Sequence, residues 1–564
     1  MSSGRSRWSV RHDSASGSET SARAGRGAFV TSLDAIELQV IVGALRAACE
    51  EMGATLVRSA RSPNIKERRD ASTALFDAGG QMVMQAEHIP VHLGSMPAAV
   101  GAVLEHEQRE GVSWALNDPF AGGTHLPDIT VVTPVFAGLG EAADRHSGAA
   151  NAAADGHSRQ LLGFAASRAH HADVGGRVPG SMPADSHTLA EEGVVISPRP
   201  LTERTIDELV ARMRNPAERR ADLRAQMAAN HTGAQRLGGL AERIGVGALR
   251  AAMAEVLDYA ERRTRACIAA LPDGVREARD VLEAREGDLD LRLRAVVDGE
   301  RLLLDFSGSA PRHAGNLNCP LAVTLSACWF AVRVLTDPDI PPSAGAYRPV
   351  EVVVPRGALL NAQPAHGEPA PAVAAGNVET SSRVADLVLS AFGCALGQGT
   401  MNNLTLGNED FSYYETLGGG QGACADADGP SGVHVAMSNT LNTPVEALER
   451  ELPLRVRAYS LRRGSGGEGA RHGGEGVVRE LEALSEMTYS LIAERRRHAP
   501  PGAAGGEPGE PGQDTLIAAD GTAIRLPGKT TGTLAAGERL RIETPGGGGY
   551  GDAADPTTRA RLRE

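Results

Sequence analysis

Apolar residues repeat at helical spacing over residues 41–52, which predicts an amphipathic helix. Asp34 and Glu37 precede this stretch with the spacing of a capping box, so the helix should begin beside them. Residues 72–84 then contain two strand-like runs separated by a turn of small residues, which predicts a β-hairpin. A second helix should begin at Ser95, close to a proline that suits a first helical turn.

Two further apolar runs, 129–136 and 160–167, predict a second pair of strands. The intervening segment 137–159 is rich in Ala, Gly and Ser, and we interpret it as a flexible insertion at the tip of this hairpin. If the two strands pair, residues just before the first and just after the second lie at the same end of the sheet.

The middle of the chain changes to a helical pattern and then returns to strands. Residues 202–270 are rich in Arg, Glu, Ala and Leu, which predicts helices broken near Pro216 and at Gly238-Gly239. Residues 280–308 predict strands joined by a tight turn.

The remaining elements complete an α+β pattern. Helices are predicted over 319–336 and 378–397, and the chain becomes rich in strands and glycine from about residue 450. Strands in hairpins mixed with helices favour an α+β fold over a doubly wound parallel sheet. We therefore expect mixed, hairpin-rich sheets with packed helices and a small C-terminal β element.

Composition shifts suggest how the chain is divided. The Ser-, Arg- and Gly-rich residues 1–30 predict a disordered tail, and 499–514 is a Pro/Gly-rich candidate linker. The expected division is a catalytic region over 31–498, with 137–159 as its insertion, followed by a small β-rich element over 515–552.

Composition excludes several classes of function. The net charge is −13 and no basic stripe is present, which argues against nucleic acid as the partner. No apolar run approaches the length needed to cross a bilayer, so we expect no membrane partner. The six cysteines are scattered without a CxxC pair, which favours a reducing compartment and hence the cytoplasm.

The best candidate metal site combines Gly-Gly-Thr-His125-Leu-Pro-Asp128 with Arg-Ala-His170-His171. His125 and Asp128 precede the outgoing strand of the second hairpin, and His170 follows the returning strand, so pairing would bring all three together. Two imidazoles and a carboxylate suit Zn, Mn or Fe, and three protein ligands leave positions open. Alternatively, polar residues at strand ends simply face solvent.

Two other clusters carry candidate catalytic groups. Glu87, His88 and His92 follow the first hairpin and could supply a general base or a metal ligand. The alternative is that one histidine packs in the core and the other caps the next helix. Asp118, just upstream of His125, could orient a ligand histidine or could only form a turn.

A charged string, Ser62-Pro-Asn-Ile-Lys66-Glu-Arg-Arg69-Asp70, lies between the first helix and the first hairpin. Alternating charges of this kind usually form a solvated face, but Lys66 or Arg69 could hold an anionic substrate.

The sequence has no complete nucleotide-binding loop. Pro-Gly-Lys529-Thr resembles the end of a P-loop, but Ala523 occupies the position of the required earlier glycine. We therefore expect that this chain does not bind ATP itself.

Six strings in order resemble the hydantoinase B/oxoprolinase family: SPNIKERRDASTALFDAGGQMVMQAEHIPVHLGSM, NDPFAGGTHLPDI, RAHHADVGG, GNLNCP, AGNVETSSR and PGGGGYG. The resemblance covers about residues 31–552. This family includes the B-type subunit of N-methylhydantoinase, the C-terminal half of 5-oxoprolinase and the alpha subunit of acetone carboxylase. Its acetone carboxylase branch holds a metal with two histidines and an aspartate, which implies His125, Asp128 and His170 here, with His170 preferred to His171.

The resemblance also implies a partner. A hydantoinase A-type subunit binds ATP and phosphorylates the substrate, and the B-type subunit performs the following step. We therefore expect the metal-site subunit of a hetero-oligomeric, ATP-dependent hydrolase of cyclic amides. The alternatives are an alpha-type subunit of a ketone carboxylase and a non-catalytic scaffold for the ATPase partner.

Overall fold

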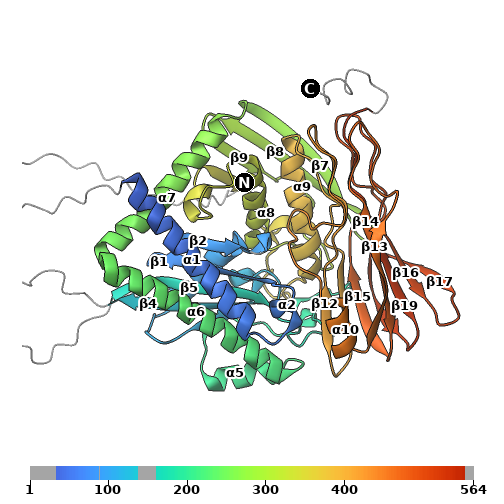
Figure 1. The fold of residues 1–564 in the computed structure, drawn as a ribbon, viewed down its shortest axis with the longest axis horizontal. Coiled ribbons are helices and arrows are strands. Elements are labelled where there is room, and N and C mark those ends of the chain that lie inside the picture. Colours follow the sequence, from blue (N-terminus) through green and yellow to red (C-terminus); the bar gives the residue numbers. More distant parts are fainter. Residues whose placement is uncertain (1–33, 88, 138–159, 553–564) are drawn as a thin grey trace, which may run out of the picture.

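The computed structural model describes residues 34–87, 89–137 and 160–552 (Figure 1). The expected tail 1–30 lies outside the described residues, as does the expected insertion 137–159 apart from Ala137. The architecture is α+β, with helices and mostly antiparallel sheets, as the sequence predicts.

The first sheet contains both predicted hairpins. Its strand order is β2-β1-β5-β4-β3-β6, and all neighbours are antiparallel. The strands are β1 (Ala71–Asp77), β2 (Met82–Glu87), β3 (Trp114–Leu116), β4 (Asp128–Ala137), β5 (Gln160–His170) and β6 (Arg199–Pro200). Since β4 and β5 pair along their length, the start of β4 lies beside the end of β5.

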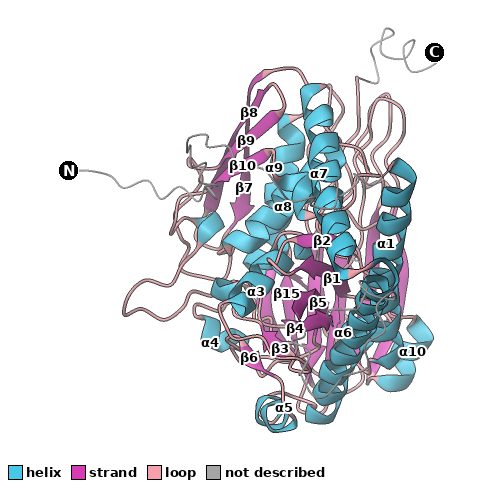
Figure 2. Cartoon of the chain, turned by 90° about the vertical axis from the view of Figure 1, so that its left-hand side faces the viewer, coloured by secondary structure: helices cyan, strands magenta, loops and turns pink. Residues whose placement is uncertain are grey.

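Three long helices cover one face of this sheet, and α3 (Ser95–Leu104) covers the other (Figure 2). The three are α1 (Ala35–Ser59), α6 (Pro216–Ile244) and α7 (Val246–Ala269). The capping box of α1 is present. The helix break predicted at Gly238-Gly239 is wrong: α6 runs through both glycines and ends at Gly245, whose φ of 90° a side chain would resist.

A second sheet lies beside the first and packs on two helices. Its order is β10-β9-β8-β7, formed by β7 (Gly274–Glu283), β8 (Asp288–Asp298), β9 (Arg301–Asp305) and β10 (Val350–Val353). The helices are α8 (Leu321–Leu335) and α9 (Ser381–Ala391). Helix α9 is shorter than the predicted 378–397, and a π-helical turn, Gly376–Thr380, precedes it.

Two C-terminal sheets lie on the right in Figure 1. One has the order β12-β11-β15-β18 and the other β13-β14-β19-β16-β17. Their strands are β11 (Asn403–Gly407), β12 (Ser412–Glu415), β13 (Leu454–Arg462), β14 (Gly476–Ala483), β15 (Met487–Ile492), β16 (Gln513–Ile517), β17 (Ala523–Leu526), β18 (Lys529–Leu534) and β19 (Arg539–Glu543). Strands after 499–514 thus pair with β14 and β15 before it, so this segment does not separate the sheets.

Short helices connect these layers: α2 (Pro63–Lys66), α4 (Leu189–Glu192), α5 (Glu203–Val210), α10 (Val445–Glu451) and the 3-10 turns Pro90–His92, Pro119–Ala121, Ala344–Tyr347 and Leu359–Asn361. None of the helices in the described ranges has the length and apolar character needed to cross a membrane.

Candidate metal centre

The hairpin of β4 and β5 brings three predicted site residues together. Asp128 begins β4, His170 ends β5, and the two residues are directly opposite each other in the register. His125 lies in the loop just before β4. Residues distant in sequence therefore become neighbours at the end of one hairpin.

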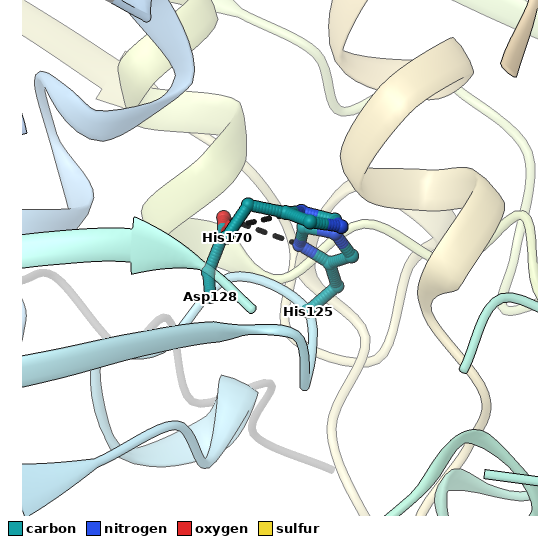
Figure 3. A group of neighbouring side chains, drawn as sticks. All are labelled: His125, Asp128 and His170. Carbon is teal, nitrogen blue, oxygen red and sulfur yellow. Dashed lines mark ion pairs between the residues drawn. The ribbon is translucent and has the colours of Figure 1, made fainter. Parts of the chain in front are cut away.

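The three side chains point toward one another (Figure 3). Nδ1 of His125 lies 3.2 Å from Oδ2 of Asp128, and Nδ1 of His170 lies 3.3 Å from Oδ1. The two imidazole rings are 5.0 Å apart between centroids. The carboxylate of Asp128 therefore contacts one imidazole with each oxygen.

The loop that carries His125 is fixed by close backbone contacts. Asn117 donates to the carbonyls of Leu126 (2.7 Å) and Val194 (3.0 Å), which ties both ends of the loop. A Cβ on Gly123 would lie 2.2 Å from the carbonyl oxygen of Asn117, so only glycine fits there. Gly122 has a φ of 92°, which also favours glycine. The Gly-Gly pair before His125 thus lets the loop fold tightly.

Burial sets the protonation of this cluster. Burial alone would raise the pKa of Asp128, but His125, with further contributions from His170 and His92, lowers it well below its ordinary value. Burial lowers the pKa of His170. An ionised carboxylate and a neutral imidazole are the forms that bind metal ions.

Unpaired polar atoms show that the cluster fits a divalent metal. Among the described residues, Nε2 of His125 and Nε2 of His170 are buried without a hydrogen-bond partner. Such atoms are costly unless an ion or water satisfies them. One ligand atom from each of His125, Asp128 and His170 lies within 4.8 Å of the others, and the donor set suits Zn, Mn or Fe.

Asp70 and His92 extend the cluster around Asp128. Ligand atoms of these three residues also lie within 4.8 Å of one another. His92 places Nε2 at 3.4 Å from Asp128 and Nδ1 at 2.9 Å from Ser72, so it bridges the aspartate to β1. Asp70 is not among the residues predicted for the site, although its position just before β1, which pairs with β5, could have revealed it.

Tyr414 on β12 forms one wall of the centre. Its ring stacks on His170 at 4.3 Å, and the Arg68 guanidinium lies 4.6 Å from the ring centroid. Its hydroxyl donates to Oδ1 of Asn403 (2.7 Å), whose amide in turn donates to Glu379 (3.2 Å). No sequence signal points to Tyr414, because β12 reaches the site only through the packing of distant sheets.

A small cavity adjoins the cluster, with about 20 Å³ of space for the centre of a water-sized sphere. That is room for about one water molecule or ion. Its lining includes His125, Asp128, His170, Tyr414 and Ser438.

Other predicted residues lie elsewhere. Lys66 and Arg69 are exposed and do not line this cavity. Asp118 is half-buried and accepts the backbone N–H of Phe120 (2.9 Å), where it caps a 3-10 turn. Glu87 ends β2, and His88 lies outside the described residues.

The neighbouring His171 faces away from the cluster. Its Nε2 lies 3.0 Å from Oε1 of Gln226 on α6, and burial lowers its pKa to about 4. The Lys529 ammonium of the partial P-loop string pairs with Glu494 and lines a separate cavity of about 440 Å³.

A buried cluster of imidazoles and carboxylates at a sheet edge, with unsatisfied nitrogens and an adjoining cavity, is typical of a metal-dependent enzyme. Comparison with known proteins identifies the family. The chain belongs to the Hydantoinase B/oxoprolinase family, whose model matches residues 34–553.

Three relatives place the chain within this family. It is 39% identical to 5-oxoprolinase 1 of Arabidopsis thaliana, over 92% of this chain and 42% of that protein. It is 29% identical to a protein of Pseudomonas sp. (strain NS671) named as the B-type subunit of a D-/L-hydantoinase, over 92% of this chain and 90% of that one. The crystal structure of ATP-dependent caprolactamase from Pseudomonas jessenii matches with a TM-score of 0.82 and 29% identity, over 93% and 92% of the two chains. The chain thus spans about two fifths of the 5-oxoprolinase.

Proposed function

We propose that this chain is the metal-site subunit of an ATP-dependent hydrolase of cyclic amides. The observation that carries the proposal is the buried cluster of His125, Asp128 and His170, whose ligand atoms converge beside a cavity. Relatives named 5-oxoprolinase and caprolactamase support the class of reaction, since 5-oxoproline and caprolactam are both cyclic amides.

The chain's own residues would hold and shape the reacting centre. A divalent ion bound there would supply Lewis-acid polarisation of the substrate. Asp128 is held from outside by Thr124, which donates to Oδ2 at 2.6 Å, and by His92. Arg168, buried behind the cluster, donates to Thr130 (2.7 Å) and adds positive charge near Asp128. The small cavity limits the water that can reach the site.

The ATP chemistry would come from a separate hydantoinase A-type chain. The match to a B-type hydantoinase subunit over nine-tenths of its length supports a separate partner, and the incomplete P-loop string is consistent with it. All six cysteines are free thiols, which supports our assignment to the cytoplasm.

The test is co-expression with the ATP-binding partner. His125→Ala and Asp128→Ala should each lose the bound metal, measured by elemental analysis, and lower ATP-dependent cyclic amide hydrolysis by at least about 10²-fold. His231→Ala, on the exposed face of α6, is the matched control and should retain both. Unchanged metal content and turnover in the first two variants would refute the proposal.

The same preparation distinguishes the carboxylase alternative. Turnover of ketones that requires bicarbonate and yields a carboxylated product would replace hydrolysis as the reaction. A wild-type chain without stoichiometric metal would favour the scaffold.

A further inference from the structure

A serine and a histidine form a short hydrogen-bonded pair beside the metal centre. Oγ of Ser438 lies 2.6 Å from Nδ1 of His434. A tight turn holds them together, since the Ser438 N–H donates to the carbonyl of Val435 (3.1 Å) and Ala436 has a φ of 50°. The hydroxyl can therefore donate to a neutral imidazole.

The serine belongs to the same cavity as the metal cluster. Ser438, His125, Asp128 and His170 all line the space that has room for about one water molecule. A water molecule in so small a space lies close to both Ser438 and the cluster. His434 stands behind the serine, where it can take up a proton without contacting the substrate.

The surroundings of His434 favour its neutral form. Burial, followed by the nearby positive charge of Arg68, lowers its pKa to about 4. Its Nε2 is buried with no hydrogen-bond partner among the described residues, so no carboxylate there stabilises an imidazolium. At neutral pH the ring therefore accepts a proton from Ser438.

We propose that Ser438 and His434 are the acid–base pair for the hydrolysis. The water proton passes to Ser438 as the serine proton passes to Nδ1 of His434, while the water oxygen bonds to the amide carbonyl carbon. When the ring C–N bond breaks, the proton returns through Ser438 to the departing nitrogen. Water is thus added across the C–N bond, with OH on carbon and H on nitrogen. This step rests on the cyclic amide hydrolysis proposed above.

The pair also fills a gap left by the sequence-based candidates. Asp118, one of the predicted catalytic groups, caps a turn and does not line the cavity. Ser438 lines it directly, which meets the geometric requirement for a general base better than Asp118 does.

Kinetics of the complex with its ATP-binding partner test the pair. Ser438→Ala and His434→Gln should each lower kcat by about 10²–10⁴-fold with metal content unchanged. Ser438→Thr, which keeps the hydroxyl, should stay within about 10-fold of wild type. The double variant should be no slower than the worse single variant, because the two groups act as a unit. Full activity of Ser438→Ala in a working complex would overturn the pair and leave the proposed function intact.

A second measurement needs no turnover. In the chain labelled with ¹³C-histidine, the His434 signal, identified by its loss in His434→Gln, should remain that of a neutral ring down to about pH 5 and should shift in Ser438→Ala. A His434 signal that titrates at its ordinary pKa of about 6.5 and ignores Ser438→Ala would overturn the pair whatever the substrate.

Discussion

At the scale of single residues, the centre depends on side chains that fix its ligands as much as on the ligands themselves. Tyr414 is the clearest case, since its ring supports His170 and its hydroxyl donates to Asn403 inside the protein. Burial makes that bond costly to remove, because Asn403 Oδ1 would lose its donor without access to water.

Tyr414→Phe should therefore lower the free energy of unfolding by about 1–3 kcal/mol and weaken metal retention, while the stacking on His170 remains. Tyr459→Phe is a close control. Tyr459 also donates to an asparagine (2.8 Å) and also carries an arginine at 4.6 Å, but it is half exposed. The control should cost about 0.5 kcal/mol or less. Equal losses of stability and metal in both variants would contradict a special role for Tyr414.

His171 gives the site a pH dependence of stability that is separate from catalysis. Burial lowers its folded pKa to about 4 from an ordinary 6.5. Between these values the unfolded chain binds a proton that the folded chain excludes, so this contribution to stability is present above about pH 6.5 and is lost as the pH falls toward 4.

His171→Gln removes this proton uptake. The melting temperature of the variant should therefore fall less steeply between pH 7 and pH 4.5 than that of wild type. Parallel curves for the two proteins would mean that His171 is not held neutral in the fold.

The residue chemistry of the centre can be partly predicted from the sequence. His125, Asp128 and His170 are accessible to such a prediction because strand pairing turns distance in sequence into proximity at a hairpin end. Ser438 and Tyr414 are not, because they come from C-terminal segments whose approach depends on packing between sheets, and no local pattern encodes that packing.

At the scale of elements, the loop before β4 controls where His125 lies. Gly123 lies so close to the Asn117 carbonyl that a methyl group has no space. The pattern that predicts the hairpins is local and strong, whereas the glycines of α6 mislead because their faces are open and a helix tolerates them there.

Gly123→Ala should displace the loop, reduce metal content and lower the melting temperature. Gly101→Ala, on an exposed position of α3 with nothing near the added methyl, should be neutral or stabilise by up to about 1 kcal/mol. Elemental analysis and thermal melting of both variants would check this. Full metal content in Gly123→Ala would show that the loop adjusts without moving His125.

At the scale of the whole molecule, buried polar contacts join parts that are distant in sequence. Arg68, next to the metal cluster, donates to the carbonyl of Tyr414 (2.7 Å) and to the hydroxyl of Thr440 (3.0 Å). The centre is therefore built jointly by the N-terminal sheet and the C-terminal sheets. The pairing of β14 and β15 with later strands explains why a composition-based boundary at 499–514 does not correspond to a gap between sheets.

A buried ion network joins the second sheet to the C-terminal sheets. Asp280 on β7 contacts Arg383 of α9 at 3.1 Å and Arg495, just after β15, at 2.7 Å. Both guanidinium groups are almost fully buried, at 0% and 4% side-chain exposure. Removing one charge from a buried pair leaves its partner uncompensated, which is far more costly than losing an exposed pair.

Asp280→Asn should therefore lower the free energy of unfolding by about 3–5 kcal/mol. Asp290→Asn is its matched control, since Asp290 on β8 also contacts two arginines, but in an exposed setting. That variant should cost at most about 1 kcal/mol. Urea unfolding of both proteins at low and high salt would check the difference, because salt screens only the exposed contacts. Similar losses in the two variants would mean that the sheets are joined by apolar packing alone, and that the charges between them are incidental.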